Sequence, residues 1–250
     1  MGFALPPAVV EETVTRALAE DVGAGDVSLA AVPKGAMGRA TLVARETGVL
    51  CGRPFAEAVL RQVGGAVTAE WPLPEGGDLA PDQPVAELAG PAGELLTAER
   101  TLLNFLQTLS GTATATAGLA ARIIDLGVRL VDTRKTLPGL RTAQKYAVRV
   151  GGGHNHRHGL FDGVLLKENH LAWAGGLEPA VAAAREAAPH TLRVQVEVED
   201  LAEMRRALEA GADALLLDNF ALADLATAVA ERPAGVFLEA SGNIGADTIR

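Results

Sequence analysis

The 250-residue sequence has one cysteine, few aromatic residues and fewer basic than acidic residues. Because Cys51 is the only cysteine, an internal disulfide is excluded, and we expect a reducing compartment and a small, buried, apolar role for this side chain. The formal net charge of -9 argues against nucleic acid as a partner. No apolar run is long enough to span a bilayer, and the first residues lack the basic region of a secretory signal. We therefore expect a cytoplasmic protein with no membrane partner.

The sequence also lacks the glycine patterns of two common nucleotide-binding classes. No G-x-G-x-x-G fingerprint and no P-loop follows any of its short apolar runs. A dehydrogenase that uses a nicotinamide cofactor and a P-loop nucleotide hydrolase are therefore both disfavoured.

The first part of the chain, to about residue 98, has a mixed α+β pattern. Proline near the start and apolar residues on one face predict helices at residues 7–20 and 54–63. Residues 38–52 read as a strand, a turn and a second strand. A broad apolar face predicts a long helix over residues 95–126, with an interruption near Gly111.

From residue 129 onward, short apolar runs alternate with helical segments. The runs cover residues 129–132, 163–167, 193–197, 214–218 and 236–241, and helical composition covers residues 176–188, 201–210 and 221–232. Alternating β and α units predict a parallel sheet, either closed as a barrel or open. The fold class is therefore α/β.

Each of these apolar runs ends in a polar residue. The five residues are Asp132, Lys167, Glu197, Asp218 and Ser241. In a barrel such positions gather at the carboxyl ends of the strands, where loops build the site. The alternative is that the strand ends simply meet water. Mixed signs at equivalent positions favour a shared polar pocket.

An acidic protein that binds an anion must concentrate positive charge locally, and residues 132–170 do so. The cationic side chains of this stretch are Arg134, Lys135, Arg141, Lys145, Arg149, His154, His156, Arg157, His158, Lys167 and His170. The planar fork of arginine binds two carboxylate or phosphate oxygens at once. The stretch therefore predicts a small ligand with several negative groups.

Not every cation in the stretch is expected to bind the ligand. Arg141, Lys145 and Arg149 recur every four residues, as on a solvated helix face, and we expect them mostly at the surface. His154, His156 and His158 alternate, as metal ligands in an extended segment can. No local cysteine or carboxylate completes a zinc site, so we favour substrate binding by one or two of these histidines.

Two carboxylates and one small-residue segment complete the candidate site. Glu197 and Asp218 end neighbouring apolar runs and suit Mg²⁺, which takes its other ligands from water and substrate oxygens. The alternative is a pair of exposed or salt-bridged acids. Ser241, Gly242 and Asn243 precede a helix expected to begin at Ile244, and their backbone N–H groups form a plausible phosphate seat.

Many blocks of the sequence occur together in one known family. In chain order they are ERTLLNFLQ at 99–107, LSG at 109–111, DTRKT at 132–136, PGLR at 138–141, KYAVR at 145–149, GGGHNHR at 151–157, KENH at 167–170, VEVE at 196–199, LDNF at 217–220 and SGN at 241–243. These blocks resemble those of the quinolinate phosphoribosyltransferases, also called carboxylating nicotinate-nucleotide pyrophosphorylases. The resemblance covers nearly the whole chain.

The resemblance implies an N-terminal α/β sandwich over residues 1–110 and an open parallel α/β barrel, the phosphoribosyltransferase domain, over residues 111–250. The implied enzyme transfers the phosphoribosyl group of phosphoribosyl pyrophosphate to quinolinate in NAD biosynthesis. Its products are nicotinate mononucleotide, pyrophosphate and CO₂, and it requires Mg²⁺.

The resemblance also implies roles for individual residues. Quinolinate carboxylates would be bound by Arg134, Lys135, His156, Arg157 and Lys167. Glu197 and Asp218 would hold Mg²⁺ and the ribose hydroxyls, and with Lys135, which also contacts the donor, they are the implied catalytic residues. Thr133 and the Ser241, Gly242 and Asn243 segment would contact substrate. Arg100 would enter the site of the neighbouring subunit, so a homodimer is implied.

One departure and three alternatives follow. Family members continue past the SGN block with another strand, a glycine-containing phosphate turn and a tail. If these 250 residues are the whole protein, the resemblance implies an incomplete barrel that lacks part of the phosphate seat; if they are a fragment, it implies no such loss. A phosphoribosyltransferase-like protein of molybdate-transport gene clusters is one alternative, although those relatives lack the HNHR and KENH motifs. A barrel that binds nucleotides or phosphorylated ligands without catalysis is the second. A metal-dependent hydrolase that uses the histidines is the third.

Overall fold

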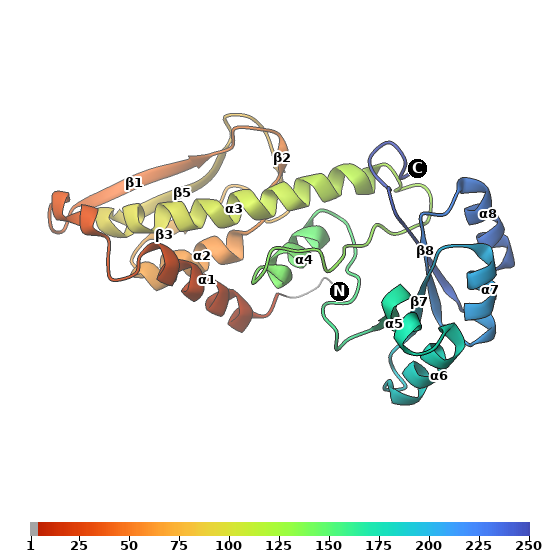
Figure 1. Ribbon diagram of the computed structural model, residues 1–250. Helices are drawn as coiled ribbons and strands as arrows, with labels where there is room; N and C mark the ends of the chain where they lie inside the picture. Colours follow the sequence, from red (N-terminus) through yellow and green to blue (C-terminus); the bar gives the residue numbers. More distant parts are fainter. Residues whose placement is uncertain (1–4) are drawn as a thin grey trace. The chain divides into compact units, whose positions relative to one another are not determined.

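The computed structural model describes residues 5–250, which divide after His156 into two compact units, the first ending at His156 and the second covering Arg157–Arg250 (Figure 1). Residues 1–4 lie outside the described residues. They belong to the N-terminal stretch for which the sequence predicts no secretory signal. Within residues 5–250, no helix has both the length and the apolar character that crossing a membrane requires.

The first unit combines helices with two small antiparallel sheets. Its helices are α1 (Pro7–Asp21), α2 (Arg53–Val63), α3 (Ala92–Ala121) and α4 (Arg141–Val150), with a 3-10 turn at Val27–Ala31. Its strands are β1 (Met37–Val43), β2 (Gly48–Val49), β3 (Thr68–Glu70), β4 (Asp78–Leu79) and β5 (Pro84–Pro91). The sheet order is β1-β5-β3, and β2 pairs with β4. The strand–turn–strand expected over residues 38–52 therefore does not pair with itself, because each of its strands finds a partner further along the chain.

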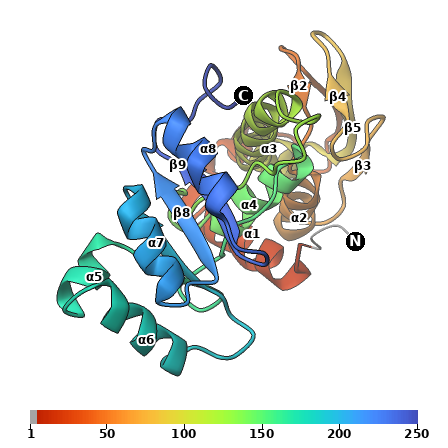
Figure 2. The same cartoon turned by 90° about the vertical axis from the view of Figure 1, so that its right-hand side faces the viewer.

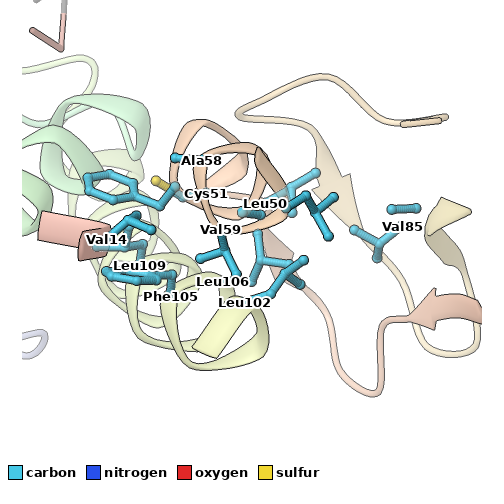
Figure 3. Close-up of a cluster of buried hydrophobic side chains, with 14 of the residues drawn as sticks. Val14, Leu50, Cys51, Ala58, Val59, Val85, Leu102, Phe105, Leu106 and Leu109 are labelled. Carbon is cyan, nitrogen blue, oxygen red and sulfur yellow. The ribbon is translucent and has the colours of Figure 1, made fainter. Parts of the chain in front are cut away.

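The core of the first unit lies among α1, α2, α3 and β5 (Figure 3). Phe55 stacks on Phe105 with ring centroids 5.2 Å apart. Cys51 is fully buried in this cluster, which confirms the apolar role expected for it. Burial, and then the nearby Glu75 carboxylate, raise the pKa of the Cys51 thiol, so it stays protonated at neutral pH.

The helix α3 is continuous, and the interruption expected near Gly111 is wrong. Leu102, Leu109 and Ala113 are all buried on one face that runs past this glycine, and Gly111 itself is exposed. A glycine in a helix costs only about 1 kcal/mol relative to alanine. Packing of the long apolar face against α2 and β2 outweighs that cost. The helix ends at Ala121 rather than near residue 126.

The helix α4 is tied to the start of α2 through Glu75. This carboxylate accepts hydrogen bonds from the backbone N–H of Gly52 at 2.8 Å and of Arg53 at 3.0 Å, and from the Tyr146 hydroxyl of α4 at 3.0 Å. An anion at a helix N-terminus satisfies N–H groups that have no partner within the helix. Glu75 therefore fixes α4 against the core of the first unit.

The second unit is a parallel sheet with helices between its strands (Figure 2). The strands β6 (Val164–Leu166), β7 (Val194–Val198), β8 (Ala214–Asp218) and β9 (Phe237–Ser241) lie in sequential order. The helices are α5 (Glu168–Trp173), α6 (Leu177–Ala187), α7 (Leu201–Glu209) and α8 (Leu222–Glu231). The α/β class expected from the sequence is confirmed. The apolar run at 129–132 is the exception, since it forms only an isolated parallel bridge, Val131 to His154, within the first unit.

The two faces of the parallel sheet differ in chemistry. Registered residues of parallel strands point the same way, and side chains alternate along each strand. Residues at even positions of β6, β7 and β9 and at odd positions of β8, such as Val196 and Leu217, pack into the apolar cluster formed with α6, α7 and α8. The opposite face carries the remaining positions of each strand. These are the odd positions of β6, β7 and β9 and the even positions 214, 216 and 218 of β8. This second face we call the polar face.

Candidate active site

The polar face brings four of the five strand-end residues together. Glu197 registers with Leu216, two residues before Asp218, and Asp218 registers with Ser241, so all of them point to the same side. Lys167 follows β6 on the same side, and its ammonium contacts the Glu197 carboxylate. The Glu197 side chain is 18% exposed and that of Lys167 is 47% exposed. One cation and two carboxylates thus share the carboxyl end of this sheet.

Both oxygens of the Asp218 carboxylate are held by neighbours. The Ser241 hydroxyl donates to Oδ1 at 2.7 Å, and the Asn219 amide donates to Oδ2 at 2.8 Å. Asn219 is fixed in turn, because its backbone N–H donates to the Ser241 carbonyl at 3.0 Å and its side-chain oxygen accepts from Asn243 at 3.1 Å. Asn219 and Asn243 both have a left-handed backbone, which asparagine tolerates better than most residues. The LDN and SGN segments therefore orient one carboxylate.

Gly242 lies where no side chain fits. Its φ is 85°, and a Cβ there would lie 2.2 Å from the Asn219 side-chain oxygen and 2.7 Å from the Asn219 backbone nitrogen. We expect Gly242→Ala to displace Asn219, which holds Asp218, and to lower kcat roughly tenfold, with left-handed strain of about 1–2 kcal/mol adding to the clash. Steady-state kinetics check this. Gly235→Ala is the control, since its φ is 88° but no atom lies within 4 Å of its Cβ position. Equal losses in both variants would show that strain, not displacement of Asn219, is responsible.

The helix expected to begin at Ile244 is wrong. Gly242 and Asn243 both have positive φ, which does not lead into a right-handed helix. Instead the Thr248 hydroxyl accepts from the Gly245 N–H at 2.9 Å and donates to the Asn243 carbonyl at 3.1 Å, which closes a turn. A phosphate seat at Ser241–Asn243 would therefore use this turn and not a helix N-terminus.

In the first unit, a braced loop carries Thr133, Arg134 and Lys135. The Thr133 hydroxyl accepts from the Lys135 N–H at 3.0 Å, and the guanidinium of Arg141 donates to the Thr136 hydroxyl at 3.1 Å and to the Arg134 carbonyl at 3.4 Å. Lys135 is exposed. Arg134 Nε is buried and has no hydrogen-bond partner within the part of the chain that the structure describes. An orphaned guanidinium nitrogen is suited to an anion.

The surface positions expected for Arg141, Lys145 and Arg149 are wrong. Arg141 and Arg149 are half-buried, and Arg149 donates to the Gly153 carbonyl at 2.8 Å. Lys145 is buried, its side chain 1% exposed, and its ammonium is paired with Asp132. Asp132 therefore serves inside the first unit and is not one of the residues on the polar face. A spacing of four residues shows that side chains share one side of a helix, but it does not show whether that side faces solvent or a buried carboxylate.

The three alternating histidines do not form a metal site. Within residues 5–250, no group of three or more His, Cys, Asp or Glu residues is placed to hold a metal ion. Burial, and then the charges of Arg149 and Arg129, lower the pKa of His154, so this ring is neutral at pH 7. His156 belongs to the first unit and His158 to the second. The structure thus gives the hydrolase alternative no support among the residues that it describes.

Sequence reasoning did not single out Asp162, Gln195 or Glu239. Asp162 closes the loop that begins with Arg157 by accepting from the N–H groups of His158 at 2.7 Å and Gly159 at 2.8 Å. Burial alone would raise the pKa of Asp162, but these backbone donors lower it overall. Gln195 and Glu239 lie on the polar face, where the Gln195 side-chain amide donates to Glu239 Oε2 at 2.9 Å. Gln195 and Glu239 could have been found from the sequence only by placing β7 and β9 correctly and then taking every second residue along each strand.

Within the same loop, Arg157 is held by its own neighbourhood. Its guanidinium donates to the Gly163 carbonyl at 3.0 Å, and a Cβ at Gly163 would lie 3.2 Å from the Arg157 side chain. The turn at Asp162 thus returns the chain to the arginine that precedes it. The planar guanidinium is thereby oriented before any ligand is bound, which lowers the entropy lost on binding.

Comparison with known proteins gives similarity over both units. The family model of the quinolinate phosphoribosyl transferase C-terminal domain matches residues 112–250, and that of the N-terminal domain matches residues 26–110. The chain is 43% identical over 255 residues to the nicotinate-nucleotide pyrophosphorylase (carboxylating) of Homo sapiens, covering 100% of this chain and 84% of that one. It is 37% identical over 230 residues to the probable enzyme of the same name from Bacillus subtilis, covering 92% and 80%. The structure of the nicotinate-nucleotide pyrophosphorylase from Francisella tularensis has a TM-score of 0.92 at 42% identity, covering 98% and 87%.

Proposed function

Because the chain belongs to the quinolinate phosphoribosyl transferase family, we infer that it transfers the phosphoribosyl group of phosphoribosyl pyrophosphate to quinolinate, with decarboxylation, in NAD biosynthesis. The products are nicotinate mononucleotide, pyrophosphate and CO₂. The observation that carries this conclusion is the polar face, where Lys167, Glu197 and Asp218 share the carboxyl end of one parallel sheet. Such an end is where α/β folds place their active sites.

We propose that cations recognise the two carboxylates of quinolinate. The residues that bind them are Arg134, Lys135, His156, Arg157 and Lys167. The orphaned Nε of Arg134, the exposed ammonium of Lys135 and the pre-oriented guanidinium of Arg157 support these roles. A twice-charged ring beside a highly charged donor needs this many positive groups, because like charges otherwise repel.

The reaction places few chemical demands on side chains. The pyridine nitrogen attacks the anomeric carbon as the bond to pyrophosphate breaks, through a state with oxocarbenium character. The positively charged ring nitrogen then accepts the electron pair released as the adjacent carboxylate leaves as CO₂, and a proton from water takes its place on the ring carbon. The protein must therefore orient both substrates and stabilise the charge of the leaving group.

We propose Mg²⁺ as the cofactor, held by Glu197 and Asp218. The donor set fits, because Mg²⁺ takes oxygen ligands and needs only one or two carboxylates when substrate oxygens and water complete its shell. Two carboxylates on one side of adjacent strands meet this need. When bound, the ion would neutralise charge on the pyrophosphate. Lys167 pairs with Glu197 and limits the repulsion between the two acids. Ser241, Gly242 and Asn243 are proposed to seat phosphate, and Thr133 to contact substrate.

We further propose that residues 1–110 and 111–250 act as two domains, that the protein is cytoplasmic, and that it is a homodimer in which Arg100 enters the neighbouring subunit's site. The ranges of the two family models support the domain division. The lone, buried cysteine supports a reducing compartment. Arg100 supports the dimer, because it is exposed on α3 and forms no ion pair within residues 5–250.

The role of Arg100 predicts complementation between two inactive variants. In a mixture of Arg100→Ala and Lys167→Ala, each mixed dimer has one site with both defects and one intact site. About a quarter of full activity should therefore return after subunit exchange, since half of the dimers are mixed. Assays of each variant alone and after mixing decide this. Activity that stays at the level of the separate variants would contradict a shared site.

The reaction itself is tested with the purified protein, quinolinate, phosphoribosyl pyrophosphate and Mg²⁺, following CO₂ and nicotinate mononucleotide. We expect both products in equal amounts. Quinolinate binding without turnover would favour a non-catalytic binding protein of the same family. Turnover of nicotinate in place of quinolinate would reassign the substrate.

A further inference from the structure

A buried ion pair joins α4 to the segment that precedes Arg134. The ammonium of Lys145 contacts the Asp132 carboxylate, and the two side chains are 1% and 7% exposed. Lys145 is among the largest fully buried side chains of the described chain. It is therefore out of reach of a ligand in solution, although it belongs to the cationic stretch.

Both members of this pair also bind the backbone of His156. The His156 N–H donates to Asp132 Oδ1 at 2.9 Å, and the His156 carbonyl accepts from Lys145 Nζ at 3.1 Å. Both backbone groups of one residue are thus held by two opposite charges. A peptide group fixed at its donor and its acceptor has little freedom to rotate or shift.

Asn155 adds two further links to the same cluster. Its side-chain amide donates to Asp132 Oδ2 at 2.6 Å and to the Lys145 carbonyl at 2.9 Å. Next to it, the Asp132 N–H donates to the His154 carbonyl at 3.0 Å, and the His154 N–H donates to the Leu130 carbonyl at 2.8 Å. Every oxygen of the Asp132 carboxylate is therefore in use, and the segments at 130–132 and 154–156 are locked in register.

Stability alone is a weak reason to keep such a pair. Taking two charges out of water carries a large desolvation penalty, and apolar replacements of similar volume are often neutral or stabilising. An apolar pair cannot supply directional hydrogen bonds to a peptide group. Here those hydrogen bonds fix the backbone of His156 on one segment to Asp132 on the other, close in sequence to Arg134 and Lys135.

We propose that Lys145, Asp132 and Asn155 are positioning residues for quinolinate, an inference that rests on the proposed function. They fix the backbone of His156 relative to the segment that carries Arg134 and Lys135. They touch no substrate themselves. The spacing between cations on the two segments, and hence the fit to two carboxylates on one ring, is set by this cluster.

The test uses the full-length protein with the double substitution Asp132→Asn and Lys145→Met. It removes both charges at nearly constant volume, so no lone charge is left buried. We expect the dissociation constant for quinolinate to rise at least tenfold at a temperature where the variant is folded, with the KM for phosphoribosyl pyrophosphate within threefold of the original. Amide exchange in a peptide spanning residues 154–158 should become faster. Lys34→Met, at an exposed lysine of the same unit, should change none of these.

Quinolinate affinity and kcat within twofold of the original in the folded double variant would overturn the inference and leave the pair a purely structural role. If the double variant does not fold, Asn155→Ala decides, because it keeps the ion pair and removes two of the links. It should weaken quinolinate binding several-fold, and unchanged binding would count against the proposal. Failure of the unmodified protein to bind quinolinate would instead overturn the proposed function, and this inference with it.

Discussion

Replacing Lys135 with alanine should lower kcat/KM for quinolinate about a hundredfold while leaving the protein folded. Lys135 is proposed to contact both a quinolinate carboxylate and the phosphoribosyl donor. Each hydrogen bond that involves a charged group contributes about 1.5–3 kcal/mol, so the loss of two gives about 3 kcal/mol even at the lower end. A loss of 1.4 kcal/mol is tenfold. Steady-state kinetics with each substrate varied in turn measure the effect.

The fold should tolerate this change, because the side chain is exposed and the loop is braced through the Lys135 backbone and not through its ammonium. Lys34→Ala is the matched control, since Lys34 is also exposed in the same unit. A melting temperature that falls together with activity would point to unfolding of the loop. A loss of activity below threefold, in a folded variant, would remove Lys135 from the list of catalytic residues.

Replacing Asp218 with asparagine should lower kcat more than a hundredfold and raise the Mg²⁺ concentration needed for half-maximal activity at least tenfold. The variant keeps the shape of the side chain and an oxygen that can accept from the Ser241 hydroxyl. It loses the negative charge of an oxygen ligand and the Oδ2 acceptor of the Asn219 amide. Even changes to groups that only support a metal ligand cost about 10–100-fold. Kinetics across a Mg²⁺ series report both quantities.

Two results separate this effect from damage to the fold. Binding of quinolinate alone should stay within threefold, because cations and not Asp218 are proposed to recognise its carboxylates. Asp224→Asn, at an exposed acid of α8 in the same unit, should be silent. If Asp218→Asn loses activity while its Mg²⁺ dependence is unchanged, the carboxylate acts on the ribose and not through the ion.

The elements of the second unit could be predicted because local pattern and tertiary structure agree there. The apolar run ending at Asp218 coincides with β8, and the helical composition at 221–232 corresponds to α8 (Leu222–Glu231). Buried parallel strands read as continuous apolar runs, and glycine or polar residues mark where they stop. The placement of Lys167, Glu197 and Asp218 on one face followed from strand ends alone.

Predictions failed where the outcome depends on residues distant in sequence. The periodicity of Lys145 is the same on a buried and on a solvated helix face, and only the approach of Asp132, thirteen residues earlier, decides between them. Gly111 is a weak helix former, yet the packing of α3 keeps the helix whole. At Ile244 the left-handed backbone of Gly242 and Asn243 turns the chain before a helix can start.

Alternation on the parallel sheet has a consequence for how this enzyme can change. Substitutions of Val196 or Leu217 act on the helix-covered side and so on resistance to heating. Substitutions of Gln195 or Glu239 act on the polar face, which also carries Glu197 and Asp218, the proposed Mg²⁺ ligands. Natural or laboratory selection can therefore change thermal stability through the residues on the helix-covered face and ligand preference through those on the polar face, although both sets lie on the same strands.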